Sequence, residues 1–132
     1  LGVYIISGLD YRFSWSPYFK SIIHIISLII LLLASMLFTW SMVSNKFFST
    51  MVRIQTERGH SIAVEGPYKY VRHPGYVGYV FMIMATPIAL GSLYALISSL
   101  FVMIIFIVRT ILEDKTLLDE LEGYEEYSHR VK

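Results

Sequence analysis

The chain has 132 residues, of which 55% are hydrophobic and only 16% are charged. Because soluble domains carry about 25% charged residues, this composition indicates a membrane protein, and the length suits one domain over residues 1–132. The net charge of +1 gives no reason to expect a nucleic-acid partner. The lack of cysteine excludes disulfides, thiolate metal sites and a cysteine nucleophile.

The N-terminal residues Leu1–Ser7 are apolar and lack the basic start of a signal peptide. They are typical of the end of an apolar helix, and we expect the domain to be N-terminally incomplete, with one or two membrane helices missing upstream. Residues 8–20 are expected to form a polar connector whose aromatic side chains suit the headgroup level of a bilayer. Within it, Ser16 and Pro17 suit the cap and first turn of the next helix.

Two long stretches are free of Asp, Glu, Lys and Arg. Residues 21–45 exceed the roughly 20 apolar residues that cross a bilayer, so they predict a spanning helix, in which His24 is expected to pack against a neighbouring helix. Residues 74–108 are too long for one ordinary span. Pro87 and Gly91 interrupt them, which predicts a helical hairpin with short legs, because a single helix would have to absorb Pro87 at about 3 kcal/mol.

The segment between these stretches is polar and basic. It contains the cations Lys46, Arg53, Arg58, Lys69 and Arg72. Positive residues stay on the cytoplasmic side, so we expect this segment in the cytoplasm. The hairpin then returns Arg109 to the same membrane face. After Arg109 we expect an amphipathic helix, with Leu117, Leu118, Leu121 and Tyr124 at helical spacing and a break or C-cap at Gly123.

Arg109 and Glu113 stand at i and i+4 near the end of the second apolar stretch, so both point to one helix face. A surface ion pair at the membrane boundary is one interpretation of this spacing. The other is a cation and an anion at the rim of a cavity, each available to a ligand. The stretch GPYKYVRHPGYVGY (66–79) leaves a similar choice between an aromatic anchor at headgroup level and ligand-binding turns, although an anchor needs no paired Gly and Pro.

Residues 53 to 132 resemble the isoprenylcysteine carboxyl methyltransferase family, in particular a short prokaryotic or archaeal member. Four features carry the resemblance: the run Gly66-x-Tyr68-x-x-x-Arg72-His73-Pro74-x-Tyr76-x-Gly78, the upstream His60-Ser61-Ile62-Ala63, the pair Arg109-x-x-x-Glu113, and the ending Gly123-Tyr124-Glu125-Glu126-Tyr127 with Arg130-Val131.

The resemblance implies an all-α integral membrane helical bundle with a C-terminal helical hairpin and a cytoplasmic cofactor pocket. It implies methyl transfer from S-adenosyl-L-methionine, which becomes S-adenosyl-L-homocysteine, to the carboxylate of a lipidated, isoprenylated cysteine at the membrane interface. Arg109 is then substrate-binding, and Arg109 and Glu113 are catalytic. His60, His73 and Glu113 could suggest a metal site, but no tight ligand spacing supports it, so we expect no metal. The expected cofactor-binding residues are Gln55, His60, Ser61, Ile62, Ala63, Tyr68, His73, Pro74, Gly75, Tyr76 and Glu113.

The residue types suit this chemistry. Tyrosine faces hold a cation such as a sulfonium, and a carboxylate such as Glu113 can pair with the donor's amine. The acceptor carboxylate is already a nucleophile at neutral pH, so alignment is the main task. Arg109 can dock it, ideally with two parallel hydrogen bonds.

Three alternatives remain. A lipid N-methyltransferase of related fold would need an acid or base near its amine acceptor instead of Arg109. An NADPH-dependent sterol reductase-like protein shares a run like RHPxYxG, but such proteins tend to follow it with an acid where this chain has Tyr79. A small membrane scaffold with an aromatic-basic anchor would need neither Arg109 nor Glu113.

Overall fold

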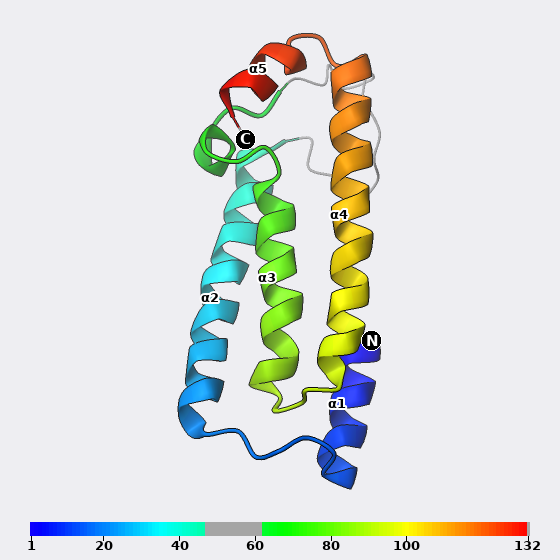
Figure 1. Cartoon of the computed structure of the whole chain (residues 1–132). Helices are drawn as coiled ribbons and strands as arrows, with labels where there is room; N and C mark the ends of the chain where they lie inside the picture. Colours follow the sequence, from blue (N-terminus) through cyan, green and yellow to red (C-terminus); the bar gives the residue numbers. More distant parts are fainter. Residues whose placement is uncertain (47–61, 132) are drawn as a thin grey trace.

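Helices make up the fold in a computed structural model that describes residues 1–46 and 62–131. The elements are α1 (Gly2–Phe13), α2 (Ser21–Ser44), the 3-10 turn η2 (Gly66–Lys69), α3 (Pro74–Ala89), α4 (Ala95–Glu120) and α5 (Tyr124–Arg130). Figure 1 shows α2, α3 and α4 side by side, with η2 and α5 together at one end and α1 at the other. The all-α prediction is confirmed.

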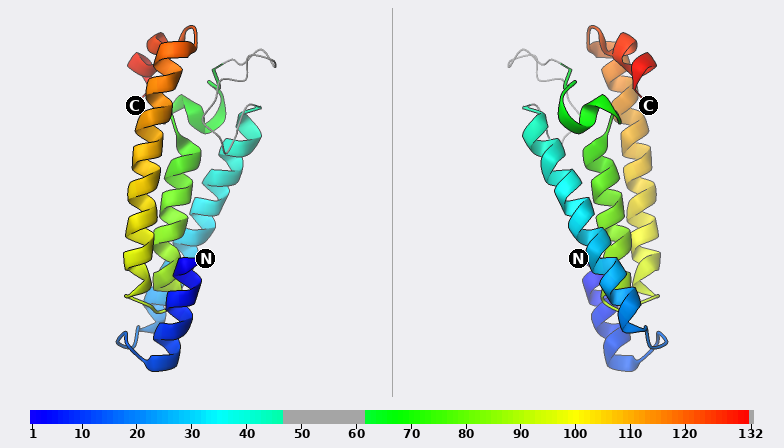
Figure 2. Two further views of the ribbon diagram at one scale, coloured as in Figure 1. Left: turned by 90° about the vertical axis from the view of Figure 1, so that its right-hand side faces the viewer. Right: turned by 90° about the vertical axis from the view of Figure 1, so that its left-hand side faces the viewer.

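Among the described residues, α2 and α4 are long and apolar enough to cross a membrane, and α3 is a shorter apolar helix. The helix predicted over residues 21–45 is therefore confirmed as α2, and its length and composition suit a membrane span. Large apolar side chains such as Leu32 on α2 and Phe101 on α4 are more than half exposed. In a protein of this composition such faces suit lipid contact. In both views of Figure 2, α2 is inclined relative to α3 and α4.

The predicted hairpin is confirmed: α3 and α4 are joined by a turn at Gly91, whose φ of 74° is left-handed and favours glycine. Pro87 lies in the last turn of α3 and does not break it. The helix expected after Arg109 is the end of α4, which continues without interruption to Glu120, whereas Tyr124 belongs to α5. No Gly or Pro occurs between residues 109 and 120, so nothing in the backbone ends the helix there. Gly123 does separate α4 from α5, with φ 82°.

The connector before α2 is shorter than expected, since α1 runs through Gly8 to Phe13. The cap predicted at Ser16 is also wrong: α2 begins at Ser21 with Lys20 as its N-cap. Asp10, only 2% exposed, explains the difference. Its carboxylate accepts the Ser16 N–H at 2.7 Å, and the Ser16 hydroxyl in turn accepts the Leu93 N–H at 2.8 Å. Ser16 therefore ties α1 to the α3–α4 turn.

Close packing of α3 on α2 fixes the start of α3, where the candidate site begins. A Cβ added to Gly78 would lie 3.0 Å from the Ala34 carbonyl oxygen and from the Phe38 nitrogen. Glycine thus allows the two backbones to approach, as small residues do in membrane helices. At the other end of the pair, His24 Nδ1 lies 2.9 Å from the Ala89 carbonyl oxygen, which confirms the packing role predicted for His24.

Candidate functional site

The hydroxyl of Tyr76 lies between Arg109 and Glu113. Pro74 occupies the first turn of α3, where its missing N–H costs nothing, and this places Tyr76 on the side of α3 that faces α4. The hydroxyl donates a short hydrogen bond to Glu113 and accepts one from Arg109 Nε at 2.9 Å. The polar segment before α3 and the polar end of α4 therefore meet, as the sequence predicted.

Aromatic and cationic groups surround the Tyr76 ring. His73 stacks on it with centroids 5.8 Å apart and planes 14° apart, and Phe106 of α4 meets it edge-on at 5.7 Å. The Arg109 Cζ lies 5.7 Å from the ring centroid, within the range of a cation–π interaction. The ring therefore has a fixed orientation, and its hydroxyl is held where a cation and a carboxylate converge.

Asp114 is the centre of a second polar cluster, which the sequence did not predict. Its carboxylate accepts hydrogen bonds from Arg72 Nη1 at 2.6 Å, from His73 Nε2 at 3.1 Å and from the Tyr124 hydroxyl at 2.7 Å. Consecutive helix residues point about 100° apart, so Glu113 faces Tyr76 while Asp114 faces residues 72 and 73. One carboxylate thus joins the start of α3, the end of α4 and α5.

The short helix α5 packs on η2 through tyrosines. The Tyr127 hydroxyl donates to the Tyr68 carbonyl oxygen at 2.7 Å. Tyr124, Tyr127 and Val131 form a buried cluster, against which Ile62, Leu117 and Leu121 pack. Burial, together with the hydrogen bond to Asp114, raises the pKa of the Tyr124 hydroxyl, and burial raises that of Tyr127 as well. Both phenols therefore remain neutral donors at physiological pH.

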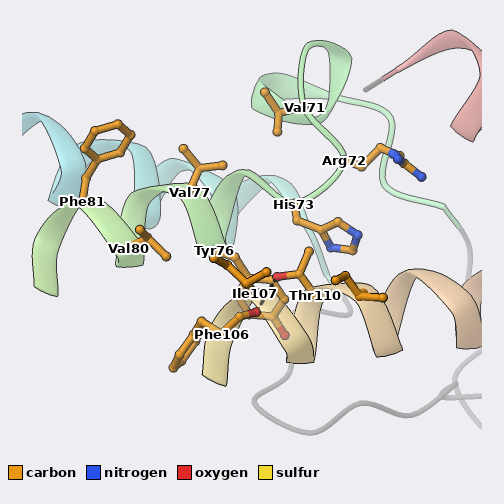
Figure 3. Close-up of a pocket in the computed structure, with 11 residues that line it drawn as sticks. Val71, Arg72, His73, Tyr76, Val77, Val80, Phe81, Phe106, Ile107 and Thr110 are labelled. Carbon is orange, nitrogen blue, oxygen red and sulfur yellow. Dashed lines mark hydrogen bonds between the residues drawn. The ribbon is translucent and has the colours of Figure 1, made fainter. Parts of the chain in front are cut away.

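An apolar groove runs between α3 and α4 beside this polar end (Figure 3). It has a volume of about 410 Å³. Arg72 and His73 lie at one end of it and Phe81 lies at the other. The lining residues are Val71, Arg72, His73, Tyr76, Val77, Val80, Phe81, Phe106, Ile107, Thr110 and Ile111. The groove can therefore accept an elongated apolar group that carries a polar head.

The structure brings together four of the residues predicted for the site: Arg109, Glu113, Tyr76 and His73. Pro74 and Gly75 are buried in the adjoining first turn of α3. Tyr68 and Ile62 lie beneath α5, and Ala63 is half-buried next to Ile62 in the chain. Gln55, His60 and Ser61 fall outside the described residues.

Three residues of this region were not assigned a role from the sequence: Arg72, Asp114 and Tyr124. Arg72 belongs to the motif before α3, but its partner is 42 positions away. A carboxylate directly after Glu113, on the adjacent face of the same helix, is the one signal that could have pointed to Asp114.

Comparison with known proteins gives one family. The model of the "Isoprenylcysteine carboxyl methyltransferase (ICMT) family" matches residues 18–119. The chain is 31% identical over 90 residues to the "Protein-S-isoprenylcysteine O-methyltransferase" of Schizosaccharomyces pombe. The matched residues make up 67% of this chain and 38% of the relative. It is 28% identical over the same length to a "Probable protein-S-isoprenylcysteine O-methyltransferase" of Oryza sativa subsp. indica, covering 67% of this chain and 47% of the relative. The chain thus spans less than half the length of these curated relatives.

Proposed function

Since the chain belongs to the isoprenylcysteine carboxyl methyltransferase family, we propose that it transfers a methyl group from S-adenosyl-L-methionine to the carboxylate of a lipid-tailed, isoprenylated cysteine. One observation carries the proposal: the Tyr76 hydroxyl links Arg109 and Glu113 beside an apolar groove that Tyr76 also lines. A cation, an anion and an apolar groove therefore meet at Tyr76. Such a reaction needs a cation for the acceptor's carboxylate, an anion for the donor's ammonium group and a groove for the lipid tail.

The residues around Tyr76 fit a cationic methyl donor. Glu113 would hold the donor's ammonium group, and the face of Tyr76 suits a positive charge, an interaction worth about 0.5 to 2 kcal/mol. When bound, S-adenosyl-L-methionine supplies a methyl group on a sulfonium. We propose that Ile62, Ala63, Tyr68, His73, Pro74 and Gly75, with Gln55, His60 and Ser61, complete this cofactor site.

Arg109 would dock the acceptor. A carboxylate with an ordinary pKa near 4 is ionised at neutral pH, so no general base has to act on it. The guanidinium can offer a carboxylate two parallel N–H groups, and the bond from its Nε to the Tyr76 hydroxyl, at 2.9 Å, fixes its plane. Holding the acceptor in line with the donor supplies several kcal/mol of the rate enhancement, as positioning does in general.

The groove between α3 and α4 would take the lipid tail. Its walls are mainly the apolar side chains of Val77, Val80, Phe81, Phe106 and Ile107. We propose that the tail enters from the bilayer while the donor enters from the cytoplasm. Lys46 and Lys69 belong to the same polar end as the site, and positive residues favour the cytoplasmic side. The protein would then be a multi-pass membrane protein whose site faces the cytoplasm.

Calorimetric titration of the purified protein with S-adenosyl-L-methionine tests the donor site. Glu113→Gln removes the charge that would pair with the ammonium, and hydrogen bonds to charged groups contribute about 1.5–3 kcal/mol. We therefore expect its dissociation constant to rise by roughly 10- to 100-fold. Glu122→Gln is the matched control, because this exposed glutamate lies outside the site.

Methyl transfer to a prenylcysteine analogue tests the role of Arg109 separately. Arg109→Ala should reduce transfer more than it weakens donor binding. Normal turnover by both the Glu113 and the Arg109 variants would refute the proposed site.

A further inference from the structure

The cationic side chain that lines the groove between α3 and α4 is Arg72, not Arg109. The residues that line the groove include Arg72 and His73 but neither Arg109 nor Glu113. Figure 3 shows Arg72 and His73 at the end of the groove opposite Phe81. A lipid-tailed carboxylate lying in this groove with its tail toward Phe81 would present its head to Arg72 first.

The Arg72 guanidinium is positioned by Asp114 so that it can bind the carboxylate of the acceptor. Its Nη1 donates to Asp114 at 2.6 Å, and its side chain is 28% exposed. Asp114 is in turn fixed by the buried Tyr124, whose hydroxyl donates to it at 2.7 Å. Within the described parts of the chain, Arg72 donates through this one nitrogen only. A guanidinium carries five N–H donors, so Arg72 can bind a second carboxylate while it stays bonded to Asp114.

We propose that Arg72 is a second carboxylate-binding residue, positioned by Asp114, which holds the acceptor's carboxylate at the mouth of the α3–α4 groove. The proposal rests on the proposed function, since it names the same acceptor. Arg72 binds the carboxylate when the tail enters the groove, and Arg109, on the other side of the hydrogen-bonded Tyr76, holds it for transfer.

Arg72 also distinguishes substrate from product. The acceptor carries a negative charge, and methylation replaces that charge with a neutral ester. A charge-assisted hydrogen bond is roughly twice as strong as a neutral one, so Arg72 binds the ester more weakly than it bound the entering acid. The tail still fits the groove, but the head no longer pairs with the cation. Arg72 therefore favours binding of the acid and release of the ester.

Titration with two matched ligands tests this inference: an S-prenylated N-acetylcysteine and its methyl ester, each added to the protein in detergent micelles. The wild-type protein should bind the acid at least about tenfold more tightly than the ester, as expected for one charge-assisted bond. Arg72→Gln should lose much of this preference, with the remainder due to Arg109, while its affinity for the ester stays the same, which also shows that the groove is intact. Lys69→Gln is the control, because it removes an exposed cation next to the same segment and should keep the preference.

The outcomes separate this inference from the proposed function. If Arg72→Gln prefers the acid as strongly as the wild-type protein does, or if the wild-type protein shows no preference, the inference is wrong, even if methyl transfer is observed. If the preference depends on Arg72 but no methyl group is transferred, the groove and its cation stand and the proposed reaction fails. If methyl transfer is observed, Arg72→Gln should raise KM for the acid with little change in kcat, whereas Arg109→Gln should lower kcat.

Discussion

Replacing Asp114 by alanine should release α5 from the rest of the protein. The change removes the acceptor of three hydrogen bonds, from Arg72, His73 and Tyr124. The Arg72 and Asp114 side chains are 28% and 20% exposed, so solvent reduces their pairing to about 0–1 kcal/mol. The bond from Tyr124 is different, because that residue is only 3% exposed.

The Tyr124 hydroxyl donates to a charged acceptor, and such a bond contributes about 1.5–3 kcal/mol. The total loss in the Asp114→Ala variant is then about 1.5–4 kcal/mol of the free energy that holds α5 in place. Local opening of α5 should become more frequent by roughly 10- to 700-fold, since each 1.4 kcal/mol is a factor of ten. Tyr124→Phe should give a somewhat smaller effect, because it removes the largest of these contributions but leaves the bonds from Arg72 and His73 to Asp114.

Hydrogen–deuterium exchange of the peptide covering residues 124–131 measures this opening directly. Exchange of these amides should accelerate strongly in Asp114→Ala and less in Tyr124→Phe. Asp119→Ala is the matched control, because Asp119 is an exposed carboxylate on the same helix. If Asp114→Ala exchanges no faster than Asp119→Ala, the Asp114 cluster does not hold α5.

Two further predictions concern stability. Gly78→Ala should destabilise the α2–α3 pair by about 1–3 kcal/mol, since its Cβ would meet the α2 backbone at 3.0 Å. Gly8→Ala is the control and should not destabilise the protein, because nothing lies within 4 Å of the added Cβ. Detergent-unfolding curves of the two variants measure the difference. The raised pKa of Tyr124 stabilises the folded state fully below the ordinary tyrosine value of about 10 and less as the pH rises above it. The unfolding midpoint of the wild-type protein should therefore be lower at pH 11 than at pH 8, and the decrease should be smaller in Tyr124→Phe. An equal decrease in the wild type and in Tyr124→Phe would contradict the role of this hydroxyl.

Much of the fold could be predicted because it depends on local patterns. The absence of charge over residues 21–45 is enough to indicate α2, and Gly91 ends one leg of the hairpin because its left-handed φ suits glycine. The end of α1 could not be predicted in this way. Asp10 and Ser16 resemble a polar connector in the sequence, but they bond to each other and to the distant α3–α4 turn.

The candidate site divides in the same way. Helical spacing places Arg109 and Glu113 on one face, and the density of Gly, Pro and Tyr marks residues 66–79 as special. Asp114 has no such signal, because its partners lie at residues 72, 73 and 124 and only the folded chain brings them together. The groove is equally hidden, since Val77, Phe81 and Phe106 are indistinguishable by type from residues that face lipid.

The central claim is that this site esterifies a lipid-tailed carboxylate. Its most direct test is methyl transfer from radiolabelled S-adenosyl-L-methionine, with an S-prenylated N-acetylcysteine and phosphatidylethanolamine offered to the same preparation. We predict base-labile label in the cysteine derivative, none in the amine lipid, and loss of the label in Arg109→Ala. Label in phosphatidylethanolamine alone, or equal labelling of the cysteine derivative by wild type and Arg109→Ala, would contradict the account.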